Sequence, residues 1–370
     1  MAILYKYSMI SDNRVVTTLE SSCCFLASLF PKVFCTSVLT WSLYVLLFVV
    51  PDFIQSSFIL TVLNIIGILL YSLCIFTYYR IILVGPGSPL DYEELKISNV
   101  SRISENPYDT DPVELPPDFL VLHTMKVNGT QGFRYCAKCS VWKPDRCHHC
   151  SSSGKCILKM DHYCPWFSTC IGFFNYKFFI QFLCYVSIYC IFLFIICGYI
   201  IYKFLTEGLF EDQFISLNIV FLLVLSFAFS LAVSVFSLFS IYLCGSNLTT
   251  IEFQERKWNG RGSNDDQTRF NYEFDANGKQ KKLANIFDLG FKENLKLVLG
   301  PNIWTWLLPI DINRKSILSE YRNGINFKVD EETYAKYLHN AELQNQLNQQ
   351  LRSYKDRIRR EREATNVIDV

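Results

Sequence analysis

The stretch "FIQSSFILTVLNIIGILLYSLCIFTYY", residues 53–79, contains no aspartate, glutamate, lysine or arginine. Three further blocks share this composition: Val33–Val50, Phe178–Tyr202 and Gln213–Thr250. Each reaches or passes the roughly 18 to 20 residues that a helix needs to cross a hydrocarbon core about 30 Å thick. A buried helix of a soluble protein could explain one such block, but four in one chain make that explanation improbable. The sequence therefore predicts four transmembrane helices.

The overall composition agrees with a membrane protein. Of the 370 residues, 51% are hydrophobic and 16% are aromatic, which is rich for a soluble protein. The block Gln213–Thr250 is long enough for one span and an interfacial turn, but too short for two spans and a loop. No cleavable signal peptide is expected, because Lys6, Asp12, Arg14 and Glu20 interrupt the first stretch. The net charge of +1 does not indicate nucleic-acid binding.

The distribution of basic residues predicts the side of the membrane on which each connection lies. Residues 80–177, between the second and third spans, carry 11 lysines and arginines, and the tail from Cys244 onward carries 20. The connection at residues 51–52 carries none, and the one at 203–212 carries one. Because cytoplasmic loops are enriched in lysine and arginine, we expect the N-terminus, the central loop and the tail to be cytosolic.

The four spans divide the chain into six predicted segments. In order, these are a cytosolic N-terminal segment (1–32), transmembrane helices 1 and 2 (33–79), a cytosolic linker (80–132), a cysteine-rich domain (133–177), transmembrane helices 3 and 4 (178–250) and a cytosolic tail (251–370). Asp91–Asp118 is expected to be irregular, and Trp258–Gly278 a polar loop. Asn285–Leu308 is expected to lie at the membrane surface. Asp330–Glu363 has a helical pattern. The oligomeric state stays open.

The cysteine-rich domain contains a candidate metal site. Cysteines of a cytosolic segment are expected to be reduced, so metal binding or nucleophilic chemistry is favoured over disulfides. Cys136 and Cys139 have the spacing of a knuckle that lets two thiolates bind one ion, and His149 and Cys156 can complete a tetrahedral set. Three sulfurs and one nitrogen are typical of a closed structural zinc site. The alternative, a pair of unrelated thiols, is disfavoured by the further cysteines and histidines nearby.

A second metal site would need four more ligands. Cys150 and Cys170 remain, but Ser153 and Tyr163 occupy the intervening positions and are poor zinc ligands. Cys147 and His148 are too close to His149 to reach a different ion without backbone strain. We therefore favour one zinc ion, and whether a second metal binds near Cys150 and Cys170 stays open.

The run "ILKMDHYCPWFS", residues 157–168, places Asp161, His162 and Cys164 within four positions, with Tyr163 among them. Two interpretations compete. The three residues either perform chemistry on a substrate, or they are remnants of a zinc module in which Tyr163 has replaced a ligand.

The complete pattern resembles a known family. The residues that carry the resemblance are Cys136, Cys139, Lys143, Pro144, Arg146, His149, Cys150, Cys156, Asp161, His162, Cys164, Pro165, Trp166, Cys170, Gly172 and Asn175. This pattern is similar to that of the DHHC protein S-acyltransferases, or palmitoyltransferases. Thr249-Thr250-Ile251-Glu252 resembles the TTxE motif of the family, and Gly85-Pro86-Gly87 resembles its DPG motif with the aspartate replaced. The order of the spans also agrees, and the resemblance extends from about residue 33 to residue 300.

The resemblance implies a fold and a reaction. The fold would be four transmembrane helices around an acyl-chain cavity, with the cysteine-rich domain beneath them. In the reaction, a cysteine takes a long acyl group from acyl-CoA as a thioester and passes it to a cysteine of a substrate protein. By position, Cys164 is the nucleophile, His162 the general base, and Asp161 the residue that orients the imidazole. A histidine oriented by a carboxylate is a common way to activate a thiol. Phe178–Phe182 and Phe221–Phe229 are candidate cavity walls.

The departures from the family pattern concern one metal ion only. The family usually binds two zinc ions, and Tyr163 and Ser153 both replace ligands of the second. We interpret this as loss of a structural metal with retention of the catalytic residues. Residues 156–182 and "NIFDLG" (285–290) most resemble the fungal vacuolar palmitoyltransferases, which suggests the vacuole membrane, with the Golgi or another endomembrane as the alternative. The expected partners are acyl-CoA, proteins with membrane-proximal cysteines and the bilayer.

Two other classes of function compete with that of an enzyme. The first is a catalytically inactive, membrane-anchored zinc adaptor that only recruits partners. A ubiquitin-ligase RING of this kind would need eight ligands in a cross-braced order, and the loss of two ligands at Ser153 and Tyr163 argues against it. The second is a transporter or channel, which predicts ionisable residues inside the spans. The four blocks contain no aspartate, glutamate, lysine or arginine.

Overall fold

The computed structural model describes most of the chain. The described residues are 14–98, 100, 116–123, 133–206, 214–258, 272–274, 280–282, 284–311 and 323–368. They form two compact units. The first unit comprises residues 1–87, 150–241 and 302–311, and the second comprises 88–149, 242–301 and 312–370. Each unit is described by itself.

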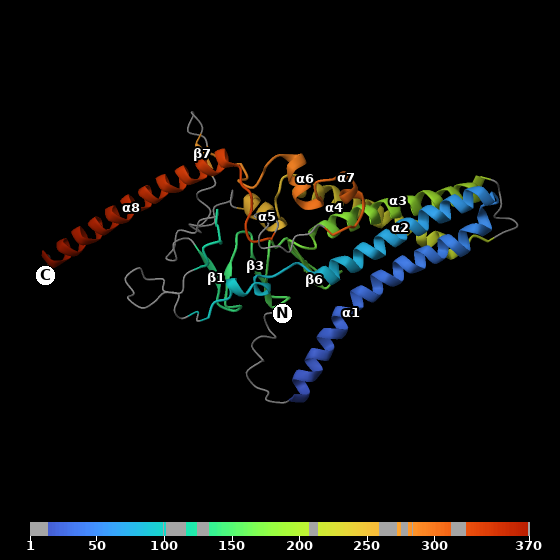
Figure 1. The fold of residues 1–370 in the computed structure, drawn as a ribbon, viewed down its shortest axis with the longest axis horizontal. Helices are drawn as coiled ribbons and strands as arrows, with labels where there is room; N and C mark the ends of the chain where they lie inside the picture. Colours follow the sequence, from blue (N-terminus) through green and yellow to red (C-terminus); the bar gives the residue numbers. More distant parts are fainter. Residues whose placement is uncertain are drawn as a thin grey trace. The chain divides into compact units, whose positions relative to one another are not determined.

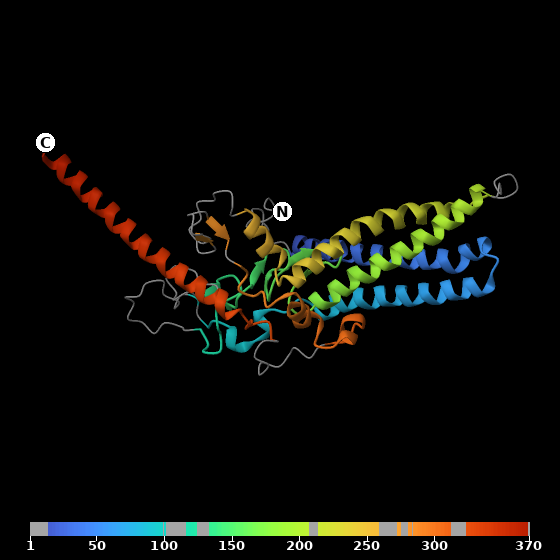
Figure 2. The ribbon, with the colours of Figure 1, turned by 90° about the horizontal axis from the view of Figure 1, so that it is seen from above.

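The first unit contains the apolar helices. Its long helices are α1 (Arg14–Tyr44), α2 (Ser57–Val84), α3 (Tyr176–Thr206) and α4 (Leu217–Gly245). α1 continues through a π-helical turn, η2 (Val45–Val49), and a 3₁₀ turn, η3 (Val50–Phe53). The helices of this unit run alongside one another in two perpendicular views (Figure 1 and Figure 2). Among the described residues, four helices are long and apolar enough to cross a membrane, which confirms the predicted number.

The burial of these helices fits a bundle that faces lipid. In α3, 61% of the most apolar window is buried, whereas the corresponding shares for α2 and α4 are 11% and 17%. α3 is therefore the central helix, and the outer helices expose apolar side chains that suit a hydrocarbon environment. The buried core contains side chains from all four spans. Examples are Leu46 of η2, Cys74 of α2, Tyr189 of α3 and Ile219 of α4. Inside it, the hydroxyl groups of Ser42 and Tyr189 form a hydrogen bond of 3.1 Å.

The helix ends differ from the charge-free blocks. The first helix begins at Arg14 instead of Val33, because charged residues prevent membrane crossing but do not prevent a helix. The last span ends at Gly245, although its charge-free block extends to Thr250. Asn247 in the following turn has a φ of 45°, a left-handed conformation that stops a helix. A turn therefore follows the fourth span within the charge-free block.

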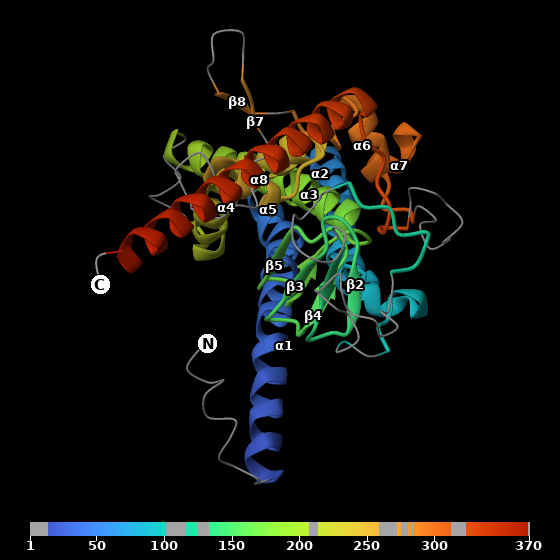
Figure 3. The ribbon, with the colours of Figure 1, turned by 90° about the vertical axis from the view of Figure 1, so that its left-hand side faces the viewer.

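The cysteine-rich segment forms three two-stranded sheets. They are β1 (Arg134–Cys136) with β2 (Val141–Lys143), β3 (His148–Cys150) with β4 (Lys155–Ile157), and β5 (His162–Cys164) with β6 (Thr169–Ile171). Several of these strands are visible in green in Figure 3. Residues with positive φ occupy each connecting turn, namely Ser140, Gly154 and Ser168. The tight turns bring cysteine and histidine side chains from neighbouring strands together.

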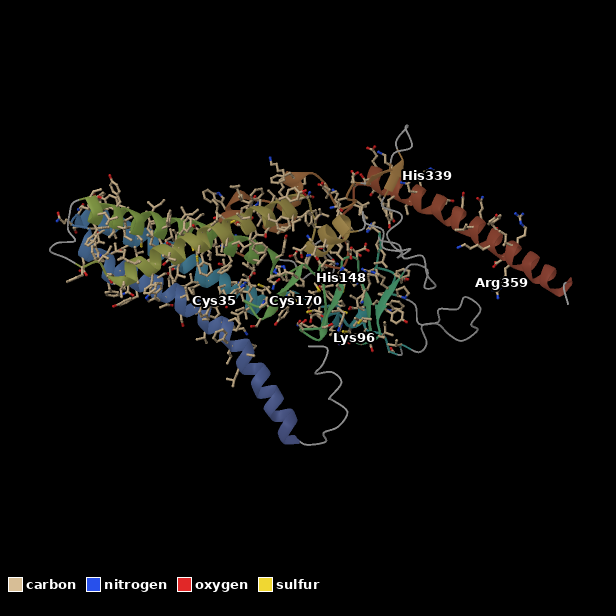
Figure 4. The ribbon with its side chains drawn as sticks, turned by 180° about the vertical axis from the view of Figure 1, so that it is seen from behind. Cys35, Lys96, His148, Cys170, His339 and Arg359 are labelled. Carbon is tan, nitrogen blue, oxygen red and sulfur yellow. The ribbon has the colours of Figure 1, made fainter. Side chains whose placement is uncertain are left out.

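The second unit contains most of the tail. Its elements include the 3₁₀ turns η4 (Pro89–Asp91) and η5 (Glu93–Leu95), α5 (Thr250–Trp258), the hairpin of β7 (Tyr272–Phe274) and β8 (Gln280–Lys282), α6 (Phe291–Leu299) and α8 (Glu331–Ile368). α8 confirms the helix predicted over Asp330–Glu363, and His339 and Arg359 mark its course in Figure 4. The predicted irregular linker and polar loop fall largely on residues outside the described ranges. α7 (Ile303–Leu307) belongs to the first unit.

A buried arginine, Arg146, connects several segments of the second unit through hydrogen bonds and ring contacts. The Arg146 guanidinium donates hydrogen bonds to both carboxylate oxygens of Glu252, each at 2.7 Å. It also donates to the side chain and the backbone carbonyl of Asn247, each at 2.9 Å. The rings of Phe287 and Phe327 lie 4.6 and 5.3 Å from its central carbon. Glu252 also closes a capping box with Thr249 at the start of α5. Motif residues far apart in the sequence therefore form one network.

Candidate functional site

The run that contains Cys164 folds as a hairpin. In the β5–β6 pair, His162 lies opposite Ile171, Tyr163 opposite Cys170, and Cys164 opposite Thr169. Successive side chains of a strand point to opposite faces. His162 and Cys164 therefore share one face of the hairpin, and Tyr163 lies on the other. The predicted catalytic residues His162 and Cys164 are therefore separated from Tyr163, the residue predicted to replace a metal ligand.

Asp161, His162 and Cys164 are brought together as predicted. Asp161 is 2% exposed, and its backbone amide donates to the Ile171 carbonyl at 2.9 Å. A carboxylate oxygen of Asp161 lies 2.7 Å from Nδ1 of His162. The Cys164 side chain is also close enough to His162 to raise the pKa of the imidazole. Because Asp161 engages Nδ1, Nε2 is the nitrogen that remains for the thiol.

The surroundings of His162 favour its charged form. Burial by itself lowers the pKa of His162, but hydrogen bonds to Asp161 and Cys164 and their negative charges outweigh burial and raise this pKa to about 9. The edges of Phe179 and Phe236 approach the imidazole, with ring centroids at 5.3 and 6.5 Å. The site can therefore hold a charged imidazole beside the Cys164 sulfur, with two aromatic rings against it.

Phenylalanines of the third and fourth spans differ in their relation to this site. Phe179 is 2% exposed and borders His162, within the predicted stretch Phe178–Phe182. The predicted stretch Phe221–Phe229 instead exposes its rings, with Phe221 at 60% and Phe227 at 54%. Phe236, two helical turns further along α4, is the ring that reaches His162. A charge-free helix gives no sequence signal for which of its faces turns inward.

The hairpin is fastened to the end of α2. The backbone amides of Leu158 and Phe174 donate to the carbonyls of Gly87 and Pro86, at 3.1 and 3.2 Å. A Cβ atom on Gly87 would lie 2.3 Å from the Phe174 ring, and one on Gly172 would lie 2.9 Å from the Leu158 carbonyl oxygen. Only glycine permits this approach. The two glycine motifs of the sequence are therefore the two sides of one contact.

Asn175 completes this attachment. Its side-chain amide donates to the carbonyl oxygens of Ile81 at 3.2 Å and Cys170 at 3.0 Å, and its carbonyl oxygen accepts from the Gly172 amide at 2.9 Å. The residue is fully buried. These hydrogen bonds tie the end of β6 to the second span and set the start of α3.

The four predicted metal ligands also come together. Ligand atoms of Cys136, Cys139, His149 and Cys156 all lie within 4.8 Å of one another. Nδ1 of His149 is 3.2 Å from the Cys139 sulfur and 3.7 Å from the Cys136 sulfur. Bonds of roughly 2.3 Å to sulfur and 2.0 Å to nitrogen imply a nitrogen–sulfur edge of about 3.5 Å in a tetrahedron. The cluster therefore fits a metal ion of that kind.

The protonation state of His149 suits a ligand. Burial, with Lys138 and Lys143 nearby, lowers the pKa of His149 below its usual range. A neutral imidazole has the lone pair that a metal needs. The structure thus combines a two-cysteine knuckle, a neutral histidine and a third thiol in one Cys₃His cluster.

The remaining pair of cysteines is packed differently. Cys150 and Cys170 are buried in a small cluster with Ile157, against which Met160 and Tyr163 pack. The Ser153 hydroxyl lies 3.6 Å from the Cys170 sulfur. In the part of the chain that the structure describes, the Cys₃His cluster is the one group of three or more potential ligands. Tyr163 and Ser153 thus both lie against the cluster that contains Cys150 and Cys170.

Comparison with known proteins agrees with these features. Four apolar helices, a Cys₃His cluster and an Asp-His-Cys hairpin define a multi-pass membrane protein with a thiol-centred site. A model of the DHHC palmitoyltransferase family matches residues 129–257. "Palmitoyltransferase PFA3" of Candida albicans is 69% identical over 371 residues, covering 97% of this chain and 98% of that protein.

More distant relatives carry the same description. "Palmitoyltransferase PFA3" of Debaryomyces hansenii is 46% identical over 100% of this chain and 99% of its own length. The protein of that name in Saccharomyces cerevisiae is 36% identical over 87% of this chain and 91% of its own length. The chain therefore belongs to the DHHC palmitoyltransferase family. It is a palmitoyltransferase of proteins, and its family uses acyl-CoA.

Proposed function

We propose that the enzyme transfers a long-chain acyl group from acyl-CoA to substrate proteins through a thioester on Cys164. The observation that supports this most is the hydrogen bond of Asp161 to His162, with Cys164 on the same face of the hairpin as His162 and close enough to raise its pKa. In this proposal Cys164 is the nucleophile, His162 exchanges its proton, and Asp161 holds the imidazole. The order of events is ping-pong, because the donor leaves before the acceptor cysteine reacts.

The first step loads the enzyme. The Cys164 thiol gives its proton to His162, and the thiolate attacks the thioester carbonyl carbon of acyl-CoA. The bond between that carbon and the sulfur of CoA breaks, and the departing thiolate takes the proton back from the imidazolium. Because Asp161 supports the charged imidazole, the proton can be held until it is needed.

The second step repeats this chemistry with a cysteine of the substrate protein. A substrate thiolate attacks the acyl group on Cys164, and the Cys164 sulfur leaves. One thioester replaces another in each step, so the reaction needs little driving force. Burial of the about 14 methylenes of a palmitoyl group at about 0.8 kcal/mol each corresponds to roughly 11 kcal/mol, but the acyl group gains as much in the lipid bilayer. The helices therefore position the acyl group more than they increase the affinity of the enzyme for it.

The cluster of Cys136, Cys139, His149 and Cys156 is proposed to hold one structural zinc ion. The support is its donor set of three thiolates and one imidazole, which leaves no open position for chemistry. Zinc there would stabilise the fold of the hairpins. The packing of Tyr163 against Cys150 and Cys170 supports a single ion.

The membrane arrangement follows from the basic residues. We propose that the N-terminal segment, the linker, the cysteine-rich domain and the tail face the cytosol, with the boundaries predicted above. The 11 basic residues between the second and third spans support this orientation. The vacuole membrane is the proposed location, on the resemblance to the fungal vacuolar enzymes. The proposed acceptors are proteins with membrane-proximal cysteines.

The alternative, a zinc-binding adaptor without catalysis, predicts no covalent intermediate. The discriminating experiment uses purified full-length protein in detergent with labelled palmitoyl-CoA. The enzyme is expected to accept about one acyl group per chain, as a single nucleophile requires, and to release it with hydroxylamine. An adaptor would give no hydroxylamine-sensitive label.

The pH dependence of loading tests the role of Asp161. With a pKa of about 9, His162 keeps its proton below that pH and loses it as the pH rises through it. Loading is therefore expected to decline above about pH 9, because a neutral His162 has no proton to return to the departing CoA thiolate. In Asp161→Asn the supporting charge is gone, so the pKa of His162 moves toward about 6.5 and the decline moves to lower pH. Single-turnover loading rates across the pH range measure this shift.

The control for this variant is Glu293→Gln, which neutralises a carboxylate on the exposed face of α6. Its pH profile is expected to match that of the unmodified enzyme. An identical alkaline limb in Asp161→Asn and in the unmodified enzyme would show that Asp161 does not set the pKa of His162.

A further inference from the structure

The turn that follows Cys164 is held by a residue of the second span. In this turn the Phe167 amide donates to the Cys164 carbonyl at 3.3 Å, and the Ser168 amide donates to the Pro165 carbonyl at 3.0 Å. Ser168 has a φ of 52°, in the left-handed region. A tight turn of this kind can fix the direction of the Cys164 side chain. It does so only if the turn is itself attached to the helices.

Tyr78 of α2 supplies this attachment. Its hydroxyl donates to the backbone carbonyl of Trp166 at 2.8 Å, two residues after Cys164. Its ring is 1% exposed and packs against Phe167 and Phe182, with centroids 5.1 and 5.7 Å apart. The ring packing accounts for stability, whereas the hydroxyl makes a directed contact with the turn itself.

The hydroxyl of Tyr78 also has a neighbour on the first span. The thiol of Cys35 is close enough to this hydroxyl for each group to affect the pKa of the other. Cys35 is labelled on α1 in Figure 4, in the same unit as Cys170. The Tyr78 hydroxyl thus lies near α1 as well as against the reactive turn.

The other attachments of the turn lie nearer its surface. The Ser168 hydroxyl donates to the Ser28 carbonyl at 2.8 Å. The Trp166 ring stacks on Phe34 at 6.5 Å and is 54% exposed. Tyr78 is 1% exposed, whereas Trp166 is 54% exposed, so Tyr78 attaches the turn from the buried side.

We propose that the Tyr78 hydroxyl is a positioning residue for the reaction, acting on Cys164 through the carbonyl of Trp166. It does not touch the reacting atoms. It holds the turn so that the Cys164 sulfur stays in line with His162 and the acyl carbonyl. A small displacement of a nucleophile lowers a rate by one to two orders of magnitude, while the affinity for the donor stays the same. This inference rests on the proposed thioester on Cys164.

The test compares Tyr78→Phe with a matched control, Tyr79→Phe. Tyr79 is the next residue of α2, and its hydroxyl pairs with Thr36 of α1 at 3.1 Å, so the control also removes a phenol hydroxyl between the same two helices. Full-length protein is loaded with labelled palmitoyl-CoA under single-turnover conditions over a range of concentrations. Tyr78→Phe is expected to lower the rate constant about tenfold, with burst amplitude and half-saturating concentration unchanged. Tyr79→Phe is expected to behave like the unmodified enzyme.

A double-mutant cycle with Cys35→Ala gives an independent check. Cys35→Ala leaves the bond to Trp166 and should lower the rate constant less than Tyr78→Phe does. Combined with Tyr78→Phe it should cause no further loss, because both changes act through one hydroxyl. Additive losses would overturn the proposal.

The remaining outcomes separate this inference from the proposed function. An unchanged rate constant in Tyr78→Phe would overturn the positioning role. If the burst amplitude fell while the rate constant stayed unchanged, the role of the Tyr78 hydroxyl would be purely structural. Neither result would affect the thioester proposal, which fails only if Cys164 itself is not labelled.

Discussion

Replacement of Cys164 by serine is expected to abolish the hydroxylamine-sensitive acyl label. A serine hydroxyl titrates far above a thiol, so the imidazole of His162 cannot ionise it at neutral pH. An acyl group on serine would also be an oxygen ester, which hydroxylamine releases much less readily than a thioester. Loss of a nucleophile typically lowers the rate by at least about 10³-fold. Labelling with palmitoyl-CoA, with and without hydroxylamine, measures the change.

The matched control for this variant is Cys184→Ser on α3. That thiol lies 3.6 Å from the hydroxyl of Ser237, so a hydroxyl in its place keeps a polar partner. Loading is expected to persist in Cys184→Ser. Stoichiometric thioester labelling in Cys164→Ser would assign the nucleophile to another cysteine, and the proposed mechanism would then be wrong.

The spans could be predicted from composition, whereas their ends could not. Absence of charge is a direct consequence of crossing a hydrocarbon core, so each charge-free block marks a span. A helix needs only suitable backbone propensity, and it continues from Arg14 past Lys32 into the membrane. The end of α4 depends on Gly245 and the left-handed Asn247, a signal inside an otherwise uniform apolar block.

The local part of the candidate site could also be predicted. Cys136 and Cys139 form a knuckle by spacing alone, and Asp161, His162 and Cys164 are neighbours in the chain. The separation of Tyr163 from His162 and Cys164 follows from the two-residue period of a strand. That period could have been applied to the sequence, but only the pairing of β5 with β6 shows that the run is a strand.

The long-range part of the site could not be predicted. Tyr78 and Trp166 are 88 residues apart, and Arg146 and Glu252 are 106 residues apart. No local pattern connects such pairs, because their contact depends on how the helices and hairpins pack. The resemblance to the family motifs singles out Arg146 and Glu252. Only the structure shows that the Arg146 guanidinium donates its hydrogen bonds to the Glu252 carboxylate. Tyr78 has no motif, and its role is visible only through the hydroxyl bond to the turn.

Replacement of Cys139 by alanine is expected to remove the metal and most of the activity. Cys139 is one of four ligands, and its sulfur lies 3.2 Å from Nδ1 of His149. Structural zinc contributes about 10–16 kcal/mol to the folding of small domains, and incomplete sites lose most of that. Purified Cys139→Ala is expected to contain almost no zinc, against about one ion per chain in the unmodified protein. Elemental analysis of the purified proteins measures this difference.

The informative control is Cys150→Ala, which removes a thiol from the adjacent hairpin. Cys150 packs with Ile157 and Cys170 in an apolar cluster, where alanine fits with modest loss of contact. If this cluster is held by packing and by the contact of Ser153 with Cys170, Cys150→Ala keeps about one zinc ion and loads palmitate. Two ions in the unmodified protein, or loss of an ion in Cys150→Ala, would place a metal beside Tyr163. The face of the β5–β6 hairpin that carries Tyr163 would then be held by metal coordination, and the single-ion proposal would be wrong.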